Sequence, residues 1–188
     1  MRARIVFLLS LFAAISVVQA ADDTRYYNDK DGNAAVWKES ETAIPTFPQR
    51  PDLIRFTAPT EAALNQYYVD GKSLILGRDD VLRFTVVIIG SGGAVNVLHQ
   101  GLDCDADEIK TYGYGTTAGK MVRRSGANWR SLIRSGPMAY QTILADRYAC
   151  DAAGLSSPVA DVLERLRNPS ISDVDHGESD SDLSSDFK

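Results

Sequence analysis

The part of the sequence with the clearest chemical potential is a basic stretch that contains a tryptophan. Between residues 119 and 145 it carries five lysine or arginine side chains and no aspartate or glutamate. Guanidinium groups bind phosphate and carboxylate through paired hydrogen bonds, and an aromatic ring can stack beside them. The candidate ligand- or partner-binding residues are therefore Lys120, Arg123, Arg124, Trp129, Arg130 and Arg134.

An ordinary solvated face, with Trp129 in the core, is the simpler explanation of the same stretch. The formal charge of the chain is −5, but six acidic residues lie after Asn168, so the remainder is close to neutral. A near-neutral domain gives no reason to expect nucleic-acid binding. Both interpretations, a binding surface and a solvated face, stay open at the level of sequence.

Groups for hydrolytic chemistry are sparse. The chain has two histidines, and His99 is the one outside the C-terminal tail. No serine lies in the Gly-x-Ser-x-Gly pattern of a nucleophile elbow, and a histidine that ends a strand is more often a packing or surface residue than a general base. A carboxylate pair drawn from Asp79, Asp80 or Asp103 stays open, because such pairing is spatial and the sequence does not reveal it.

Motif-like strings for cofactors and metals are incomplete. Residues 113–118 match the letters of the dinucleotide fingerprint, but a β-prone segment follows where a helix is needed. Residues 29–33 resemble the start of a calcium loop without its turn glycine, and three aspartates alternate around Cys104 in a pattern that water satisfies. We predict no catalytic residue, no metal site and no cofactor.

The N-terminus has the pattern of a secretory signal peptide. Two arginines precede an apolar run at residues 5–18, and small residues end at Ala20. The run is shorter than the roughly 20 residues needed to span a bilayer. We therefore expect cleavage after Ala20, export to the periplasm and no transmembrane segment in the mature chain.

The only two cysteines, Cys104 and Cys150, are expected to pair. In an oxidising compartment two cysteines of one small domain most often form a disulfide. The alternative is a redox-active or nucleophilic thiol, which the absence of a Cys-x-x-Cys spacing disfavours.

Two apolar runs, 81–89 and 94–100, are joined by the glycine-rich residues 90–93 and predict a central β-hairpin. In the first run, alternate apolar residues share one face of the strand. Val87 and Ile89 lie on the opposite face, so another element must cover that face, and a helix is one candidate. Asp70-Gly71 has the composition of a turn. Further strands are expected at 53–57, 66–70, 109–112 and 120–124.

Helices are predicted at 137–150 and 158–167, and the prolines of 44–51 predict an extended segment held by Trp37, Ile44 and Phe47. The expected fold is α+β, an antiparallel sheet of about five strands with one or two C-terminal helices packed on it. Its organisation is a signal peptide (1–20), a flexible N-terminal arm (21–35), a single domain (36–167) and an acidic Ser/Asp-rich disordered tail (168–188).

A series of short matches runs through the domain and resembles the CNP-one-like family of small exported proteins of Gram-negative bacteria. The resemblance covers roughly residues 37–168 and implies export, a single domain and paired cysteines, but no reaction or ligand. His99-Gln100 stand where relatives more often carry an aromatic-acidic pair, so these two are not expected to mark a family site. The matching residues include Trp37, Glu39, Pro45, Tyr68, Asp70, Asp79, Arg83, Phe84, Asn96, Gly101, Cys104, Tyr112, Tyr114, Trp129 and Cys150.

Together these observations predict a non-enzymatic envelope protein that binds an unknown envelope protein or an anionic envelope ligand. Lipid headgroups, lipopolysaccharide phosphates, peptidoglycan carboxylates or an acidic protein surface would suit the basic stretch. A hydrolase acting on envelope polymers through a carboxylate pair is the alternative. A purely structural domain of an envelope complex is a third possibility.

Overall fold

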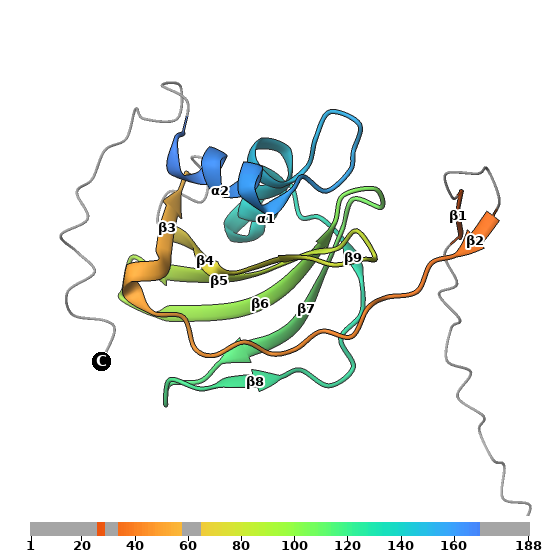
Figure 1. Ribbon diagram of the computed structural model, residues 1–188. Helices are drawn as coiled ribbons and strands as arrows, with labels where there is room; N and C mark the ends of the chain where they lie inside the picture. Colours follow the sequence, from red (N-terminus) through yellow and green to blue (C-terminus); the bar gives the residue numbers. More distant parts are fainter. Residues whose placement is uncertain (1–25, 29–33, 58–64, 170–188) are drawn as a thin grey trace, which may run out of the picture. The chain divides into compact units, whose positions relative to one another are not determined.

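A computed structural model describes residues 26–28, 34–57 and 65–169 (Figure 1). The chain forms two compact units, residues 1–38 and residues 39–188. In the first unit, β1 (Tyr26–Asn28) pairs antiparallel with β2 (Ala34–Val36). These strands lie almost wholly in the predicted arm, for which the polar sequence had indicated no pairing. The predicted signal peptide and the tail beyond Pro169 lie outside the described residues.

The second unit is built on one antiparallel sheet of seven strands, so the predicted α+β class and central hairpin are confirmed. The strand count exceeds the expected five, partly because β9 has only two residues and leaves no sequence signal. This last strand pairs with β7 beside β8. The sheet order is β3 (Leu53–Phe56), β4 (Asn65–Leu76), β5 (Leu82–Gly90), β6 (Val95–Asp103), β7 (Glu108–Gly115) and β8 (Met121–Arg123), with β9 (Arg130–Ser131) off this path.

The turn predicted at Asp70-Gly71 is instead an irregularity inside β4. The pairing of β4 with β5 shifts register between Asp70 and Ile75, and the strand then continues to Leu76. The Asp70 carboxylate accepts the Lys72 N–H at 3.1 Å, and the Ser73 hydroxyl donates to the Asp70 carbonyl at 2.8 Å. Turn chemistry therefore bends this strand without ending it.

The helical elements cover one face of the sheet, hereafter the helix face (Figure 1). A 3₁₀ turn η3 (Gly136–Met138), α1 (Tyr140–Leu144) and a π-helical turn η4 (Ala145–Ala149) follow one another, and α2 (Val159–Arg167) comes after a loop. The core between helices and sheet contains Leu82, Phe84, Val86 and Ile88 from β5, as the alternation predicted. The ring of Tyr140 stacks on Tyr67 with centroids 5.2 Å apart.

A disulfide links Cys104, in the turn after β6, to Cys150, directly after η4, as predicted. The S–S distance is 2.04 Å and the two residues are 46 positions apart. Both cysteines pack against the core between the sheet and the helices. The bridge therefore fastens the end of the helical segment to the sheet.

Residues 39–49, hereafter the crossing segment, lie along the second face of the sheet (Figure 1). Phe47 packs there against Tyr68, Val87 and Ile89. The cover on this face is thus an extended, proline-containing segment and not the helix considered from sequence. The prediction that Phe47 holds this segment to the core is confirmed.

Glycines on β7 make room for the crossing segment. A Cβ atom on Gly115 would lie 2.8 Å from the Phe47 ring, and one on Gly113 would lie 3.1 Å from the side chain of Ile44. Leu53 and Met121, from the two edges of the sheet, pack against the same small cluster as Phe47. The sheet must therefore curve around this segment.

Removing the disulfide should cost about 4 kcal/mol of unfolding free energy, because the bridge closes a 46-residue loop of the unfolded chain. Chemical denaturation of the oxidised protein and of Cys104→Ser/Cys150→Ser would measure this difference. The reduced wild type is the matched control and should resemble the double variant. Equal denaturation midpoints with and without reductant would contradict the prediction.

Candidate functional site

A buried ion pair joins the turn before β5 to β5 itself. Both amino groups of the Arg83 guanidinium donate to the Asp79 carboxylate, at 2.9 and 2.7 Å. The side chain of Arg83 is 6% exposed and that of Asp79 is 1% exposed. Such a bidentate geometry fixes both groups in orientation as well as in charge.

The crossing segment completes this ion pair. The Nε of Arg83 donates to the Thr42 hydroxyl at 2.6 Å, and a terminal nitrogen donates to the Ser40 carbonyl at 3.1 Å. The Ser40 N–H donates in turn to Asp79 at 2.7 Å. Burial alone would raise the pKa of Asp79, but the hydrogen bonds from Arg83 and Ser40 outweigh it and hold that pKa below its ordinary value.

His99 lies in a polar row across the second face of the sheet and is 3% exposed. Its Nδ1 is 3.1 Å from the Thr85 hydroxyl. Burial lowers the pKa of His99 to about 4, and the charges of Arg83 and Arg123 act in the same direction. The register places in this row, strand by strand, Asp70, Thr85, His99, Gly113 and Arg123.

A buried, neutral imidazole is poorly placed for acid–base catalysis, since a general base must reach the substrate proton directly or through water. The ring of His99 lies 6.0 Å from that of Tyr112, and its hydroxyl neighbour Thr85 is fully buried. This geometry agrees with the packing role that the sequence favoured for His99.

An aromatic and cationic cluster continues from the ion pair toward β9. The Tyr112 ring meets Trp129 edge-on with centroids 6.4 Å apart, and the Lys110 ammonium lies within 5.6 Å of both rings. Glu39 of the crossing segment accepts from Lys110 at 2.7 Å and from the Trp129 indole N–H at 3.3 Å. Trp129 therefore takes part in internal packing. This agrees with the interpretation from sequence that placed Trp129 in the core.

The Tyr112 hydroxyl is buried and finds no partner at hydrogen-bonding geometry among the described residues. Its ring occupies space above β6 that Gly101 leaves open, since a Cβ there would lie 2.7 Å from the hydroxyl. Burial, and after it the neighbouring Glu39 carboxylate, raise the pKa of Tyr112. The phenol is therefore neutral and serves packing.

The six predicted binding residues separate into two groups. Arg123 donates to the Thr42 carbonyl at 2.7 Å, Trp129 belongs to the cluster above, and Arg134 forms an exposed ion pair with Asp107 at 2.7 Å. The remaining three, Lys120, Arg124 and Arg130, are exposed and form no ion pair with any residue that the structure describes. We call these three residues the basic edge.

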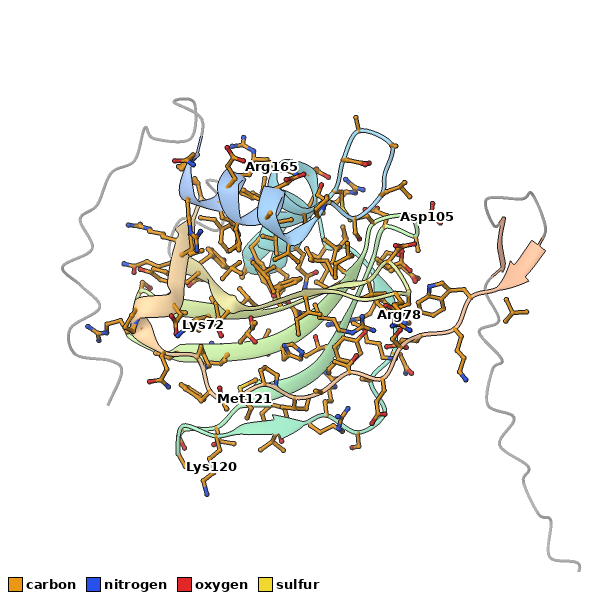
Figure 2. All side chains as sticks on the ribbon, in the orientation of Figure 1. Lys72, Arg78, Asp105, Lys120, Met121 and Arg165 are labelled. Carbon is orange, nitrogen blue, oxygen red and sulfur yellow. A yellow bond between two sulfur atoms is a disulfide. The ribbon has the colours of Figure 1, made fainter. Side chains whose placement is uncertain are left out.

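The basic edge follows β7 and its extension. The Lys120 carbonyl accepts from the Thr116 N–H, the Arg124 N–H donates to the Tyr112 carbonyl, and Arg130 pairs with Ile109. The basic edge is thus attached at Thr116, Tyr112 and Ile109. At about 3.3 Å per residue, the first two attachment points lie about 13 Å apart and the last two about 10 Å apart. Two exposed apolar residues, Tyr114 (45%) and Val122 (38%), pair with each other beside this line. Lys120 extends into solvent at the β8 hairpin (Figure 2).

The carboxylates considered for hydrolysis are held in different ways. Both oxygens of Asp79 accept hydrogen bonds inside the protein. Asp103 is buried and accepts the Ala106 N–H at 3.2 Å, whereas Asp80 is exposed at a positive φ of 57° in the turn before β5. No group of three or more His, Cys, Asp or Glu side chains suited to a metal ion occurs within the described ranges.

Sequence reasoning missed the Arg83 network, although a signal was present. Arg83 alternates with Thr85, Val87 and Ile89 on a face that had to be covered, so its charge was bound to be buried and to need a partner. Asp79, four residues earlier, was an available candidate. The contributions of Ser40 and Thr42 had no sequence signal, because their contacts bridge about 40 positions.

Replacing Arg83 with Gln should destabilise the protein by about 3–5 kcal/mol, because Asp79 would stay buried without its countercharge. Urea denaturation would measure the loss. Asp79→Asn/Arg83→Met should lose less than the sum of its single changes, since no uncompensated charge remains. The control Arg167→Gln, at an exposed site in the last turn of α2, should change stability by less than about 0.5 kcal/mol. A loss no larger than in this control would contradict the network.

Stability should also fall as the pH drops from 6.5 toward 4, because His99 in the unfolded chain takes up its proton at the ordinary pKa of 6.5 and the buried ring only at about 4. The contribution is fully present above this window and amounts to about 3 kcal/mol. Denaturation at stepped pH would show this slope in the wild type and not in His99→Gln. Identical slopes in the two proteins would refute a neutral buried imidazole.

No helix of the described part is both long and apolar enough to cross a membrane. Comparison with curated proteins and with solved structures gives no match to this chain. A family model does match residues 32–167, and its description is CNP1-like family, the family that the sequence resembled. The match covers the whole described second unit except for its last two residues. The chain belongs to the CNP1-like family.

Proposed function

We propose that this protein is exported to the periplasm and acts there by binding an anionic partner through the basic edge, without catalysing a reaction. The observation that carries the proposal is the contrast between two sets of charged residues. Arg83, Asp79 and Lys110 are engaged inside the fold, whereas the cations of the basic edge face solvent. Exposed arginine and lysine beside apolar side chains are suited to phosphate or carboxylate.

The leader sequence and the disulfide support the proposed compartment. A bridge of this kind persists in oxidising environments and is rare in the cytosol. Cys104 and Cys150 are the only cysteines of the chain and are joined to each other, so no cysteine is left as a nucleophile. Both features are expected of a mature periplasmic protein.

The alternative, a hydrolase using a carboxylate pair, has less support. A nucleophilic or basic carboxylate needs an oxygen free to reach the substrate, and hydrogen bonds from Arg83 and Ser40 take up both oxygens of Asp79. Asp80 and Asp103 would then have to act without it.

Reversal of the basic edge should abolish binding to anionic partners. We expect Lys120→Glu/Arg124→Glu/Arg130→Glu to lower binding by at least about tenfold, since each cation near an anionic surface contributes about 1 kcal/mol. Three probes distinguish the sources of the anion: vesicles of phosphatidylcholine and phosphatidylglycerol, purified lipopolysaccharide, and solubilised envelope proteins. Arg123 is left unchanged because it holds the crossing segment.

The matched control is Lys72→Glu/Arg78→Glu/Arg167→Glu, which makes the same change of charge at exposed positions outside β7, β8 and β9. Circular dichroism melting confirms that both variants are folded. Wild-type binding should weaken when the salt is raised to about 0.5 M. Equal losses in the two variants, or no loss in either, would remove the basic edge from consideration.

A further inference from the structure

We propose that the acidic segment at residues 173–186 of the same chain docks along the basic edge and competes there with external anions. The inference rests on the proposed function in one respect, that the basic edge is the binding surface. It adds a regulator to that surface, an occupant that an external partner must displace.

Charge complementarity is the first support. The basic edge presents three exposed cations, and two acidic residues of neighbouring segments already have partners: Glu39 pairs with Lys110 and Asp107 with Arg134. The candidate occupant carries six carboxylates and no lysine or arginine. These are Asp173, Asp175, Glu178, Asp180, Asp182 and Asp186.

The spacing of the charges is the second support. Glu178, Asp180 and Asp182 alternate, so in an extended conformation their carboxylates point to one side and span about 13 Å. The backbone attachment points of Lys120 and Arg124 are separated by the same four-residue interval along β7 and its extension. An extended acidic segment would therefore match the line of cations in sign and would match the interval between Lys120 and Arg124, whereas the interval from Arg124 to Arg130 is shorter by one residue.

Reach is the third support. The described residues end just after α2, which packs against β3 and β4, whereas β8 is at the opposite edge of the sheet. Five strand intervals correspond to about 24 Å. Arg167 and Asp182 are 15 positions apart, and a random coil of that length has a root-mean-square span of about 21 Å, close to that separation. Effective concentration is highest when span and separation match.

The alternative is that the acidic segment pairs with cations near the end of α2 and not with the basic edge. Arg165 and Arg167 are in the last turn of α2, at the root of the segment, and a merely tethered acidic chain would meet them first. Lys72 lies on β4 near this end of the sheet, and its side chain is 78% exposed. Figure 2 shows Lys72 and Arg165 apart from Lys120 at the β8 hairpin. Lys72 is the internal control for Lys120, and because its amine pairs with Asp52 at 3.0 Å, the comparison is made in an Asp52→Asn background that removes this pair.

Carbodiimide crosslinking of the exported full chain, followed by mass spectrometry, tests the docking directly. The reagent joins a carboxylate to a lysine amine within contact distance. We expect the segment to be joined to Lys120 at least about threefold more often than to Lys72 at about 20 mM salt, and this preference to vanish at about 0.5 M. Equal or greater joining to Lys72 would overturn the proposal.

Two variants separate docking from chance collision. Arg124→Gln/Arg130→Gln keeps Lys120 as the reporter and should lower its crosslinks severalfold, whereas Arg78→Gln/Arg167→Gln should leave them unchanged. If the first variant has no effect, or the second has as large an effect as the first, the segment does not recognise the basic edge.

A chain with its six tail carboxylates changed to Asn or Gln tests the competition. With the phosphatidylglycerol vesicles as the probe, this variant should bind at least about threefold more tightly than the wild type. If neither protein binds any of the anionic probes, the proposed function fails, while the crosslinks still decide whether the segment docks. If the probes bind but the neutral tail gives no gain, the competition is refuted and the proposed function survives.

Discussion

The structure depends on a charge that the sheet buries on its second face. Arg83 projects from the central strand β5 into a region without bulk water, where an unpaired guanidinium would be very costly. Asp79 supplies the countercharge, and the crossing segment supplies the remaining acceptors at Ser40 and Thr42. The ion pair therefore determines where this irregular segment must lie. Apolar contacts such as those of Phe47 are less directional and would determine its position less precisely.

The elements with strong periodicity could be predicted from sequence. The hairpin at 81–100, the edge strand near 121, both helical segments and the disulfide each had a local signal, because alternation, glycine turns and proline positions act over a few residues. The bulge in β4 was misread as a turn, since Asp70-Gly71 has the same composition in either role. The strands β1 and β2 have only three residues each, too few for alternation to reveal them.

The site was less predictable than the fold. Clustering arginines along the sequence indicated one surface, but strand pairing distributes them: Arg123 turns toward the crossing segment and Arg134 toward Asp107. Trp129 was considered for both a binding role and a core role, and its contacts with Tyr112 and Glu39 favour the second. Successive side chains of a strand point to opposite faces of the sheet, so an error of one residue in a predicted strand boundary places each side chain on the wrong face. The sequence alone could not show which of these residues would face solvent.

The crossing segment also constrains the order in which the native contacts can form. Its contacts join residues far apart along the chain: Ser40 with Asp79 at 39 positions, Glu39 with Lys110 at 71 and Glu39 with Trp129 at 90. Contacts of such long range slow folding, because loops must close before any of them stabilises the chain. A polypeptide that emerges from a ribosome or a translocation channel with its N-terminus first therefore cannot complete the docking of residues 39–49 until Trp129 has emerged.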